Sequence, residues 1–226
     1  MNKLFAATLF AAAMTAGTAM AVPVTLLDTD FNSLPSGISG YTTTTQATGL
    51  GSVGMTNKVI HNRTTGNPAS ATNFAIAGVG TGSSVVVTFN LGLIDSWDSN
   101  NGSPSPDWFN VFANGSSVYQ LTTNNASGSA FTPPAGTTLL SSGTNKFGSS
   151  YKDSFYSVSL NFLSTAQDLT LSFFASGAGW QGGGDESWML DNLKVTAEAP
   201  AVPLPAGLPL LVGALAVFGV ARRKRA

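Results

Sequence analysis

Apolar and polar residues alternate along much of the sequence between residues 22 and 199, the pattern of a β-strand with one buried face. The clearest segment is VVVTFNL at 85–91, whose odd-numbered residues are all apolar. The same alternation returns at 156–162 and 169–173. Because no stretch of this region has a convincing helical period, the sequence predicts an all-β domain.

Turn-forming residues separate these segments. Asn114-Gly115 lies between the apolar-rich segments 108–113 and 117–122 and predicts a hairpin, since both residues tolerate positive φ. Other strands are expected at 24–27, 58–61, 73–77 and 187–197. The polar segment 122–150 is expected to be a surface loop with room for one short strand. About eight short strands joined by turns predict an antiparallel β-sandwich of the jelly-roll, lectin-like type.

Composition excludes several kinds of chemistry. The sequence has no cysteine and one histidine, His61, which excludes zinc–thiolate sites, iron–sulfur clusters, thiol nucleophiles and histidine-rich metal sites. Between residues 22 and 199, five basic residues accompany all eleven acidic ones, a net charge near −6. This charge disfavours nucleic acid as a partner and suits a setting in which divalent cations are available.

The first 21 residues have the features of a secretory signal peptide. Lys3 precedes an apolar run at 4–14, and small residues end in Ala19-Met20-Ala21. This order predicts export and cleavage after Ala21, since the apolar run is short for a transmembrane helix. Residues 22–199 are then expected to form one domain, large enough to bury a core without disulfides.

The last residues, 200–226, combine a linker at 200–205 with three ordered features. A short proline-rich motif is formed by Val202, Pro203, Leu204, Pro205 and Ala206. The uncharged segment 204–221 would span about 27 Å as a helix, enough for a somewhat thin bilayer. A basic stop follows, formed by Arg222, Arg223, Lys224 and Arg225. The cations predict that this end stays on the cytoplasmic side of the inner membrane.

This tail resembles the PEP-CTERM family of bacterial sorting signals, in the variant whose motif reads VPLPA. The resemblance implies that an exosortase recognises the tail, cuts near the motif and sends the protein to the cell surface or extracellular matrix. The inner membrane would then hold the chain only transiently. The residues alone leave open an ordinary C-terminal membrane anchor, whereas Pro209 and the terminal cations argue against an apolar core helix.

A second resemblance covers roughly residues 83–195. The segments FNLGLIDSWD, DWFNVFANG and ASGAGWQGGGDESWMLDNLKV are similar to a sandwich domain carried by many PEP-CTERM proteins. That resemblance implies a fold broadly similar to lectin-like and carbohydrate-binding modules. It defines no catalytic residue.

Acidic residues gather in two places where a strand meets a loop, around 95–107 and 185–191. Strict alternation would place Asp191 on the same inward face as Met189 and Leu193, where a carboxylate needs a cation or backbone N–H groups as a partner. We expect a structural calcium site, because calcium prefers hard oxygen ligands. The expected ligands are Asp185, Glu186 and Asp191, with Asp30 within reach. The alternative is that these aspartates cap turns, and no EF-hand spacing is present.

Tryptophan beside acidic and amide residues suggests sugar binding, since an aromatic ring can stack on a pyranose whose hydroxyls bond to Asp and Asn. Trp180, in a glycine-rich loop, is the expected stacking residue, and Trp188 is expected to be partly exposed. The expected ligand-binding set is Trp180, Asp95, Asp98 and Asp107. The alternative for the tryptophans is core packing.

Catalysis is weakly indicated. Paired carboxylates can hydrolyse glycosides, but the adjacent Asp185 and Glu186 need not face each other, and a Ser-His-Asp triad would have to use His61 without a G-x-S-x-G motif. We therefore expect an exported non-catalytic protein of the cell surface or exopolysaccharide matrix that binds an extracellular glycan or has a structural role. The alternatives are a carbohydrate-active enzyme and a periplasmic protein that stays anchored in the membrane.

Overall fold

The computed structural model describes residues 22–99, 105–125, 132–148 and 151–198. These residues form twelve β-strands and one short 3-10 helix, so the prediction of an all-β domain is confirmed. None of the helical structure in the described residues is long and apolar enough to cross a membrane. The expected signal peptide (1–21) and the linker, sorting motif, apolar segment and basic stop (200–226) lie outside the described residues.

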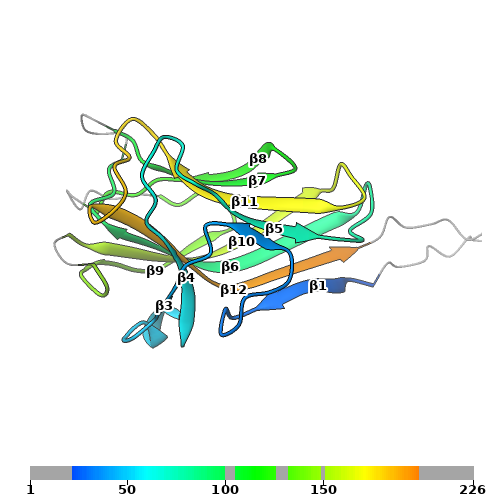
Figure 1. The fold of residues 1–226 in the computed structure, drawn as a ribbon, viewed down its shortest axis with the longest axis horizontal. Coiled ribbons are helices and arrows are strands. Elements are labelled where there is room, and N and C mark those ends of the chain that lie inside the picture. Colours follow the sequence, from blue (N-terminus) through cyan, green and yellow to red (C-terminus); the bar gives the residue numbers. More distant parts are fainter. Residues whose placement is uncertain (1–21, 100–104, 126–131, 149–150, 199–226) are drawn as a thin grey trace, which may run out of the picture. The chain divides into compact units, whose positions relative to one another are not determined.

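The larger sheet has seven strands, all paired antiparallel (Figure 1). Their order is β3 (Thr44–Gln46), β4 (Lys58–Asn62), β12 (Glu186–Glu198), β6 (Ser84–Asp95), β10 (Asp153–Leu163) and β9 (Thr137–Thr144), with β1 (Val24–Thr29) also paired to β12. Strand β6 pairs along one edge of β12, so β4 and β1 share its other edge. There, β4 pairs with residues 188–190 and β1 with residues 193–197.

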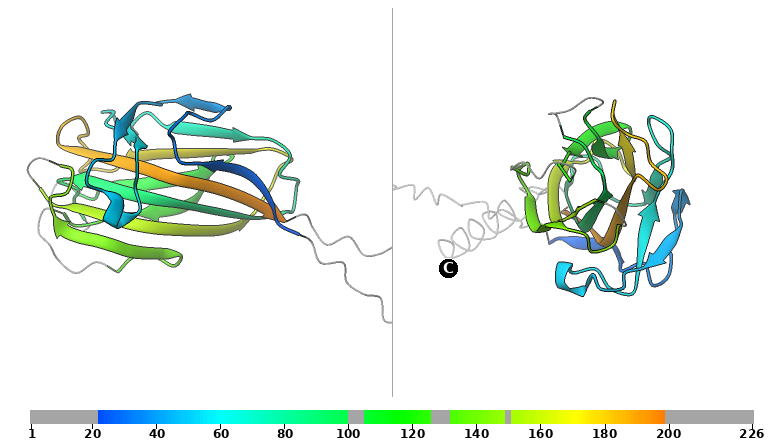
Figure 2. Two further views of the ribbon diagram at one scale, coloured as in Figure 1. Left: turned by 90° about the horizontal axis from the view of Figure 1, so that it is seen from below. Right: turned by 90° about the vertical axis from the view of Figure 1, so that its left-hand side faces the viewer.

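The smaller sheet has five strands, also antiparallel, and lies across the larger one (Figures 1 and 2). Its order is β2 (Ile38–Gly40), β5 (Thr72–Ile76), β11 (Leu169–Ser176), β7 (Trp108–Ala113) and β8 (Ser116–Leu121). The fold is therefore an antiparallel β-sandwich, as the alternating pattern predicts.

The main core lies between the two sheets and is rich in aromatic side chains. Phe173 of β11 packs edge-on against Phe74 of β5 and Phe89 of β6, with ring centroids 5.6 and 5.5 Å apart. Phe109 of β7 packs in the same way against Trp188 of β12, at 5.3 Å. Both sheets contribute to these contacts, so the aromatic side chains join the sheets to each other.

A second, smaller apolar cluster covers the outer face of the larger sheet. The 3-10 helix η1 (Gly51–Val53) and Met55 contribute to it, and Met189 of β12 is buried beneath them. Trp188 and Leu190, the neighbours of Met189, belong instead to the main core. The first half of β12 is therefore buried on both faces.

The expected position of Asp191 on the face of Leu193 is wrong, because β12 does not alternate strictly. The pairing of β12 with β6 shifts between Asp191 and Lys194, and Asn192 has a φ of 51°. This irregularity is a β-bulge, in which an extra residue turns the following side chains to the opposite face. Leu193 then points into the main core, whereas Asp191 lies on the face of Met189.

The other predicted strands are present within a few residues of their expected ends. The hairpin prediction is confirmed, since Asn114 and Gly115 connect β7 to β8 with φ values of 48° and 80°. The polar segment 122–150 contains β9, whose eight residues form one edge of the larger sheet.

The first and last residues of the sandwich domain lie next to each other, at the same end of the sandwich. Val24, at the start of β1, pairs with Ala197, near the end of β12. Glu186, at the start of β12, lies at the other end of that strand, together with the loops that follow β6 and precede β7 (Figure 1).

Candidate functional site

Three carboxyl groups from distant parts of the sequence meet at the start of β12. Asp98 follows β6, Asp107 precedes β7, and Glu186 is the first residue of β12. One oxygen atom from each lies within 4.8 Å of the other two. Pairing of β12 with β6, which places Glu186 opposite Asp95, brings these segments together.

Backbone groups hold one oxygen of two of these carboxyl groups. Asp107 Oδ2 accepts from the backbone N–H of Asp98 at 2.6 Å, and Glu186 Oε2 accepts from that of Gln181 at 2.7 Å. The second oxygens, Asp107 Oδ1 and Glu186 Oε1, are buried and have no hydrogen-bond partner. The exposed fractions of Asp107 and Glu186 are 0% and 1%, so a polysaccharide cannot reach their oxygens.

Burial and mutual repulsion shift the titration of all three groups. Burial raises the pKa of Glu186 to about 8. The Asp107 and Asp185 carboxylates raise this pKa further, whereas the hydrogen bonds from the Gln181 and Gly182 N–H groups lower it. Burial likewise raises the pKa of Asp107 to about 6. Burial and then the Asp185 carboxylate raise the pKa of Asp98. Without a positive charge between them, these groups hold protons at pH values where ordinary carboxyl groups are ionised.

The expected calcium ligands Asp185, Glu186, Asp191 and Asp30 do not form a single group. Glu186 and Asp191 are five residues apart on β12, a separation of roughly 17 Å along an extended strand. Asp185 lies beside the cluster of Asp98 and Glu186, where its Oδ1 accepts from Ser96 Oγ at 2.9 Å. The structure instead brings Glu186 together with Asp98 and Asp107, which sequence analysis assigned to sugar binding.

Asp191 has backbone partners, one of the two alternatives expected for it. Its Oδ2 accepts from the N–H of Thr56 at 3.0 Å, and its Oδ1 accepts from the N–H of Asn192 at 2.8 Å. Burial raises the pKa of Asp191 to about 6. The two hydrogen bonds act to lower this pKa, and the Asp30 carboxylate acts to raise it further. Asp191 thus ties the covering segment around η1 to the bulge in β12.

The tryptophans named as sugar-stacking candidates are mostly core residues. Trp180 is 7% exposed and packs against Trp97 with ring centroids 5.2 Å apart, so the expectation that it offers an open stacking surface is wrong. Trp188 is fully buried, which contradicts its expected partial exposure. The glycine-rich loop folds over these rings because the Gln181 and Gly182 N–H groups bond to Glu186. Trp108 remains partly exposed.

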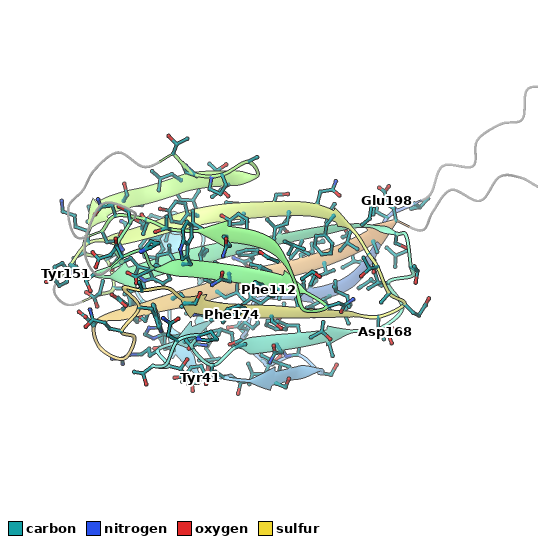
Figure 3. All side chains as sticks on the ribbon, turned by 90° about the horizontal axis from the view of Figure 1, so that it is seen from above. Tyr41, Phe112, Tyr151, Asp168, Phe174 and Glu198 are labelled. Carbon is teal, nitrogen blue, oxygen red and sulfur yellow. The ribbon has the colours of Figure 1, made fainter. Side chains whose placement is uncertain are left out.

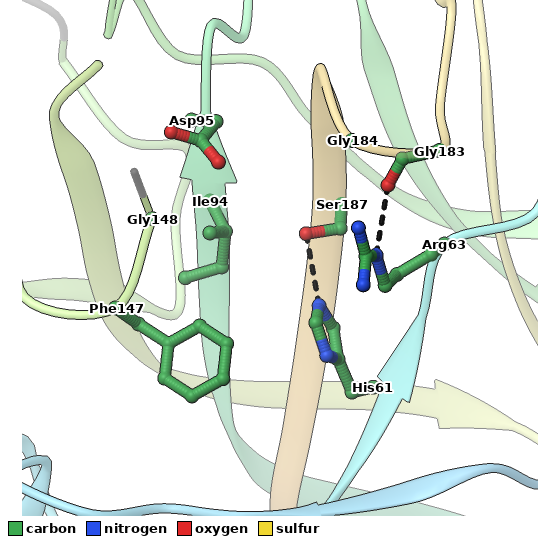
Figure 4. Close-up of a pocket in the computed structure, with 9 residues that line it drawn as sticks. All are labelled: His61, Arg63, Ile94, Asp95, Phe147, Gly148, Gly183, Gly184 and Ser187. Atoms are coloured by element: carbon green, nitrogen blue, oxygen red, sulfur yellow. Dashed lines mark hydrogen bonds between the residues drawn. The ribbon is translucent and has the colours of Figure 1, made fainter. Parts of the chain in front are cut away.

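A pocket of about 160 Å³ opens around His61 and Ser187 (Figure 4). Its lining includes His61, Arg63, Asp95, Phe147, Gly183 and Ser187. His61 Nε2 and Ser187 Oγ are 2.9 Å apart, and Arg63 Nε donates to the Gly183 carbonyl at 2.8 Å. The volume is below the roughly 300 Å³ at which small-molecule sites usually begin. The pocket suits a small polar group better than a sugar chain.

His61 should make the fold sensitive to acid. Burial, and then the Arg63 cation, lower the pKa of His61 to about 4, so the folded protein binds fewer protons than the unfolded chain between pH 6.5 and 4. The His61 contribution to stability is complete above pH 6.5 and decreases as the pH falls through this range. Between pH 7 and pH 4, the free energy of unfolding of the wild type should fall by about 3 kcal/mol more than that of His61→Gln. Urea unfolding of both proteins at several pH values measures this difference, and parallel curves would contradict the assignment.

Asp153 is a structural residue of this pocket that sequence analysis missed. Its Oδ2 accepts from the N–H groups of Lys146, Phe147 and Gly148, and its Oδ1 accepts from that of Asp95. Phe147 thereby contacts His61 edge-on, with ring centroids 5.3 Å apart. The available signal was an aspartate between a polar loop and an alternating strand, a position typical of a turn cap.

The outer face of the five-stranded sheet carries a different kind of surface (Figure 3). Phe112 of β7 and Phe174 of β11 point outward and pack together with ring centroids 5.1 Å apart. Trp108 occupies the same face of β7 and is also partly exposed. We call Trp108, Phe112 and Phe174 the aromatic face. Every residue in the five strands of this sheet is uncharged.

Amide and hydroxyl groups lie among these aromatic rings. Asn110 Nδ2 donates to Ser176 Oγ at 3.0 Å and to the Phe174 carbonyl at 3.3 Å. Gln120 Nε2 donates to Asn110 Oδ1 at 2.8 Å. This network orients a polar row next to the aromatic side chains and joins β8, β7 and β11.

No protein-family model matches this sequence, and no curated protein matches it. A family 35 carbohydrate-binding module from an environmental isolate has a similar backbone, with 12% identity, a TM-score of 0.40, and coverage of 79% of this chain and 99% of that one. A xylan-binding domain from Paenibacillus barcinonensis gives 8% identity, a TM-score of 0.41, and coverage of 81% and 100%. Dimeric latent PorU from Porphyromonas gingivalis gives 12% identity and a TM-score of 0.41, with coverage of 83% of this chain and 14% of that one. These likenesses are too distant to assign a ligand to this chain.

Proposed function

We propose that this protein is an exported, non-catalytic, lectin-like β-sandwich that binds a neutral extracellular polysaccharide through its aromatic face. The observation that carries the proposal is the outward Phe112–Phe174 pair on an uncharged sheet, where the buried Asn110 holds the exposed Gln120 amide beside the rings. Aromatic rings complement the apolar C–H faces of pyranose rings, and amide groups complement their hydroxyls. The outer face of a sheet can offer such contacts to several consecutive sugar units.

The acidic cluster of Asp98, Asp107 and Glu186 and the pocket next to His61 fit a polysaccharide less well than the aromatic face does. The carboxyl oxygens of Asp107 and Glu186 are covered by protein, and the pocket next to His61 is smaller than a usual ligand site. The absence of charge in the five strands also favours a neutral polymer over an acidic one, because a polyanion would require lysine or arginine on this surface.

The aromatic face can be tested by separate Trp108→Ala and Phe174→Ala substitutions. Each should weaken polysaccharide binding about tenfold, since an aromatic contact contributes up to about 1.5 kcal/mol. The measurement is affinity electrophoresis in gels containing hydroxyethyl cellulose, xylan, mannan or mixed-linkage β-glucan, with alginate as an anionic comparison. Tyr151→Ala, which removes an exposed aromatic side chain outside this face, is the matched control.

Retardation of the wild type by at least one neutral polymer, lost in the two variants and kept in Tyr151→Ala, is the expected result. Wild-type retardation by alginate alone, or by none of these polymers, would contradict the proposal. Equal retardation of the Phe174→Ala and wild-type proteins would show that binding occurs elsewhere.

For localisation, we propose export through the inner membrane and sorting by an exosortase to the cell surface or extracellular matrix. The support is the VPLPA motif at 202–206, followed by an apolar segment and four cations. The intact mass of the protein recovered from the cell surface should lack the signal peptide and Arg222–Arg225. A mass that retains the four cations would favour a permanent membrane anchor instead.

A further inference from the structure

We propose that Asp98, Asp107 and Glu186 bind one calcium ion, at a site separate from the aromatic face. The observation that points to a ligand is the pair of buried oxygen atoms without partners, Asp107 Oδ1 and Glu186 Oε1. Buried polar atoms are nearly always paired with protein, water or an ion. Two such atoms in one group of acidic side chains can be satisfied by a shared cation, and a proton shared between the two carboxyl groups is the competing arrangement.

The spacing of the three groups fits a single ion. Calcium binds oxygen at 2.3–2.6 Å, so two of its ligands can be no more than about 5 Å apart. The contributing oxygens of Asp98, Asp107 and Glu186 all lie within 4.8 Å of one another. They can therefore contact the same ion without a change in the strands that hold them.

Charge also calls for a cation here. No lysine or arginine in the part of the chain that the structure describes forms an ion pair with Asp98, Asp107 or Glu186. The nearby Arg63 uses its Nε to bond the Gly183 carbonyl. Two buried carboxylates beside a partly exposed third would be costly without a counter-charge, whereas a divalent ion offsets most of their charge.

Calcium fits this donor set better than other common metals. All three ligands are carboxylates, and zinc sites in proteins usually contain histidine or cysteine. Magnesium requires a near-octahedral shell and keeps several waters, whereas calcium accepts irregular geometry. Asp98 is partly exposed, so water can complete the shell on that side.

The ion would join three segments that are far apart in the sequence. Glu186 Oε2 remains bonded to the N–H of Gln181, so the glycine-rich loop would be linked to the ion through Glu186. The backbones of Asp98 and Asp107 are already paired through Asp107 N–H and the Asp98 carbonyl at 2.9 Å. An ion between these side chains would stabilise the loops at this end of the sandwich.

The test is calcium titration of the full-length protein after removal of metals with a chelator. Isothermal titration calorimetry should show one site, and calcium at a hundredfold excess over the dissociation constant should raise the melting temperature by roughly 5–10 °C. Asp107→Asn and Glu186→Gln should abolish both effects. Asp191→Asn removes another buried carboxylate, outside the proposed site, and should keep them.

The neutral variants keep this test independent of folding failure. Asparagine and glutamine remove negative charge from a crowded group, so the metal-free variants should melt no lower than the metal-free wild type. Absence of calcium binding to the wild type would overturn the proposal and favour a proton shared between Asp107 and Glu186. Binding that persists in both variants, or disappears only in Asp191→Asn, would also overturn it. Polysaccharide binding is measured separately, so either proposal can fail alone.

Discussion

Asp153→Ala is expected to destabilise the protein by about 4 kcal/mol, because it removes a buried carboxylate that accepts from the backbone N–H groups of Asp95, Lys146, Phe147 and Gly148. Hydrogen bonds to a charged acceptor contribute about 1.5–3 kcal/mol each, and the partial exposure of residues 146–148 reduces the total. The melting temperature should fall by roughly 8–16 °C in a domain of this size. Urea unfolding and calorimetry measure both quantities.

A more specific readout comes from hydrogen exchange. The amide protons of residues 146–148 should be protected in the wild type and should exchange much faster in Asp153→Ala. Asp28→Ala is the matched control, since it removes a surface carboxylate that pairs with Lys194 at 3.1 Å and should cost less than about 1 kcal/mol. Equal losses of stability in the two variants would contradict the role assigned to Asp153.

Phe173→Ala is expected to reduce the free energy of unfolding by about 3–5 kcal/mol. Phe173 is fully buried and contacts Phe74, Phe89 and Phe109, so its removal leaves a cavity between the two sheets. These neighbours belong to separate strands of both sheets and cannot close the space without moving the backbone. Chemical denaturation with a fluorescence readout measures the loss.

The adjacent residue supplies the control for this prediction. Phe174 is next on the same strand, but its side chain lies on the outer face, where it is partly exposed. Phe174→Ala should therefore cost about 1 kcal/mol while weakening polysaccharide binding. If the two variants lost equal stability, the assignment of inner and outer faces along β11 would be wrong.

The strands with one buried face could be predicted because their pattern is local. Residues 85–91 and 169–173 alternate in sequence as they do in exposure. Strand β9 carries no such signal, since most of its side chains are exposed and only one neighbour, β10, pairs with it. An edge strand of this kind is specified by its partner more than by its own residues.

The candidate sites depend on contacts that sequence spacing does not show. The acidic residues could be identified, but Asp98 meets Glu186 only because β6 and β12 are neighbours in the larger sheet. The bulge after Asp191 turns Leu193 to the opposite face from Met189 and Asp191, and no single residue type predicts a bulge there. The predicted calcium ligands were therefore grouped incorrectly, although Glu186 belongs to the group proposed here.

The aromatic face had a readable signal that sequence analysis did not use. Trp108, Asn110 and Phe112 occupy alternate positions along β7, so they had to share one face, on which Trp108 and Phe112 are partly exposed. The pattern does not say which of two half-apolar faces enters the core, because both contain aromatic residues. The partner strands decide this, since Phe109 and Val111 meet the aromatic cluster between the sheets.

Because Val24 pairs with Ala197, the first and last strands of the domain place both of its chain ends at the same end of the sandwich. Strand β12 runs from Glu186 to Glu198, which corresponds to roughly 40 Å of extended chain. The chain therefore enters and leaves the domain at the end of the sandwich opposite the loops around Glu186.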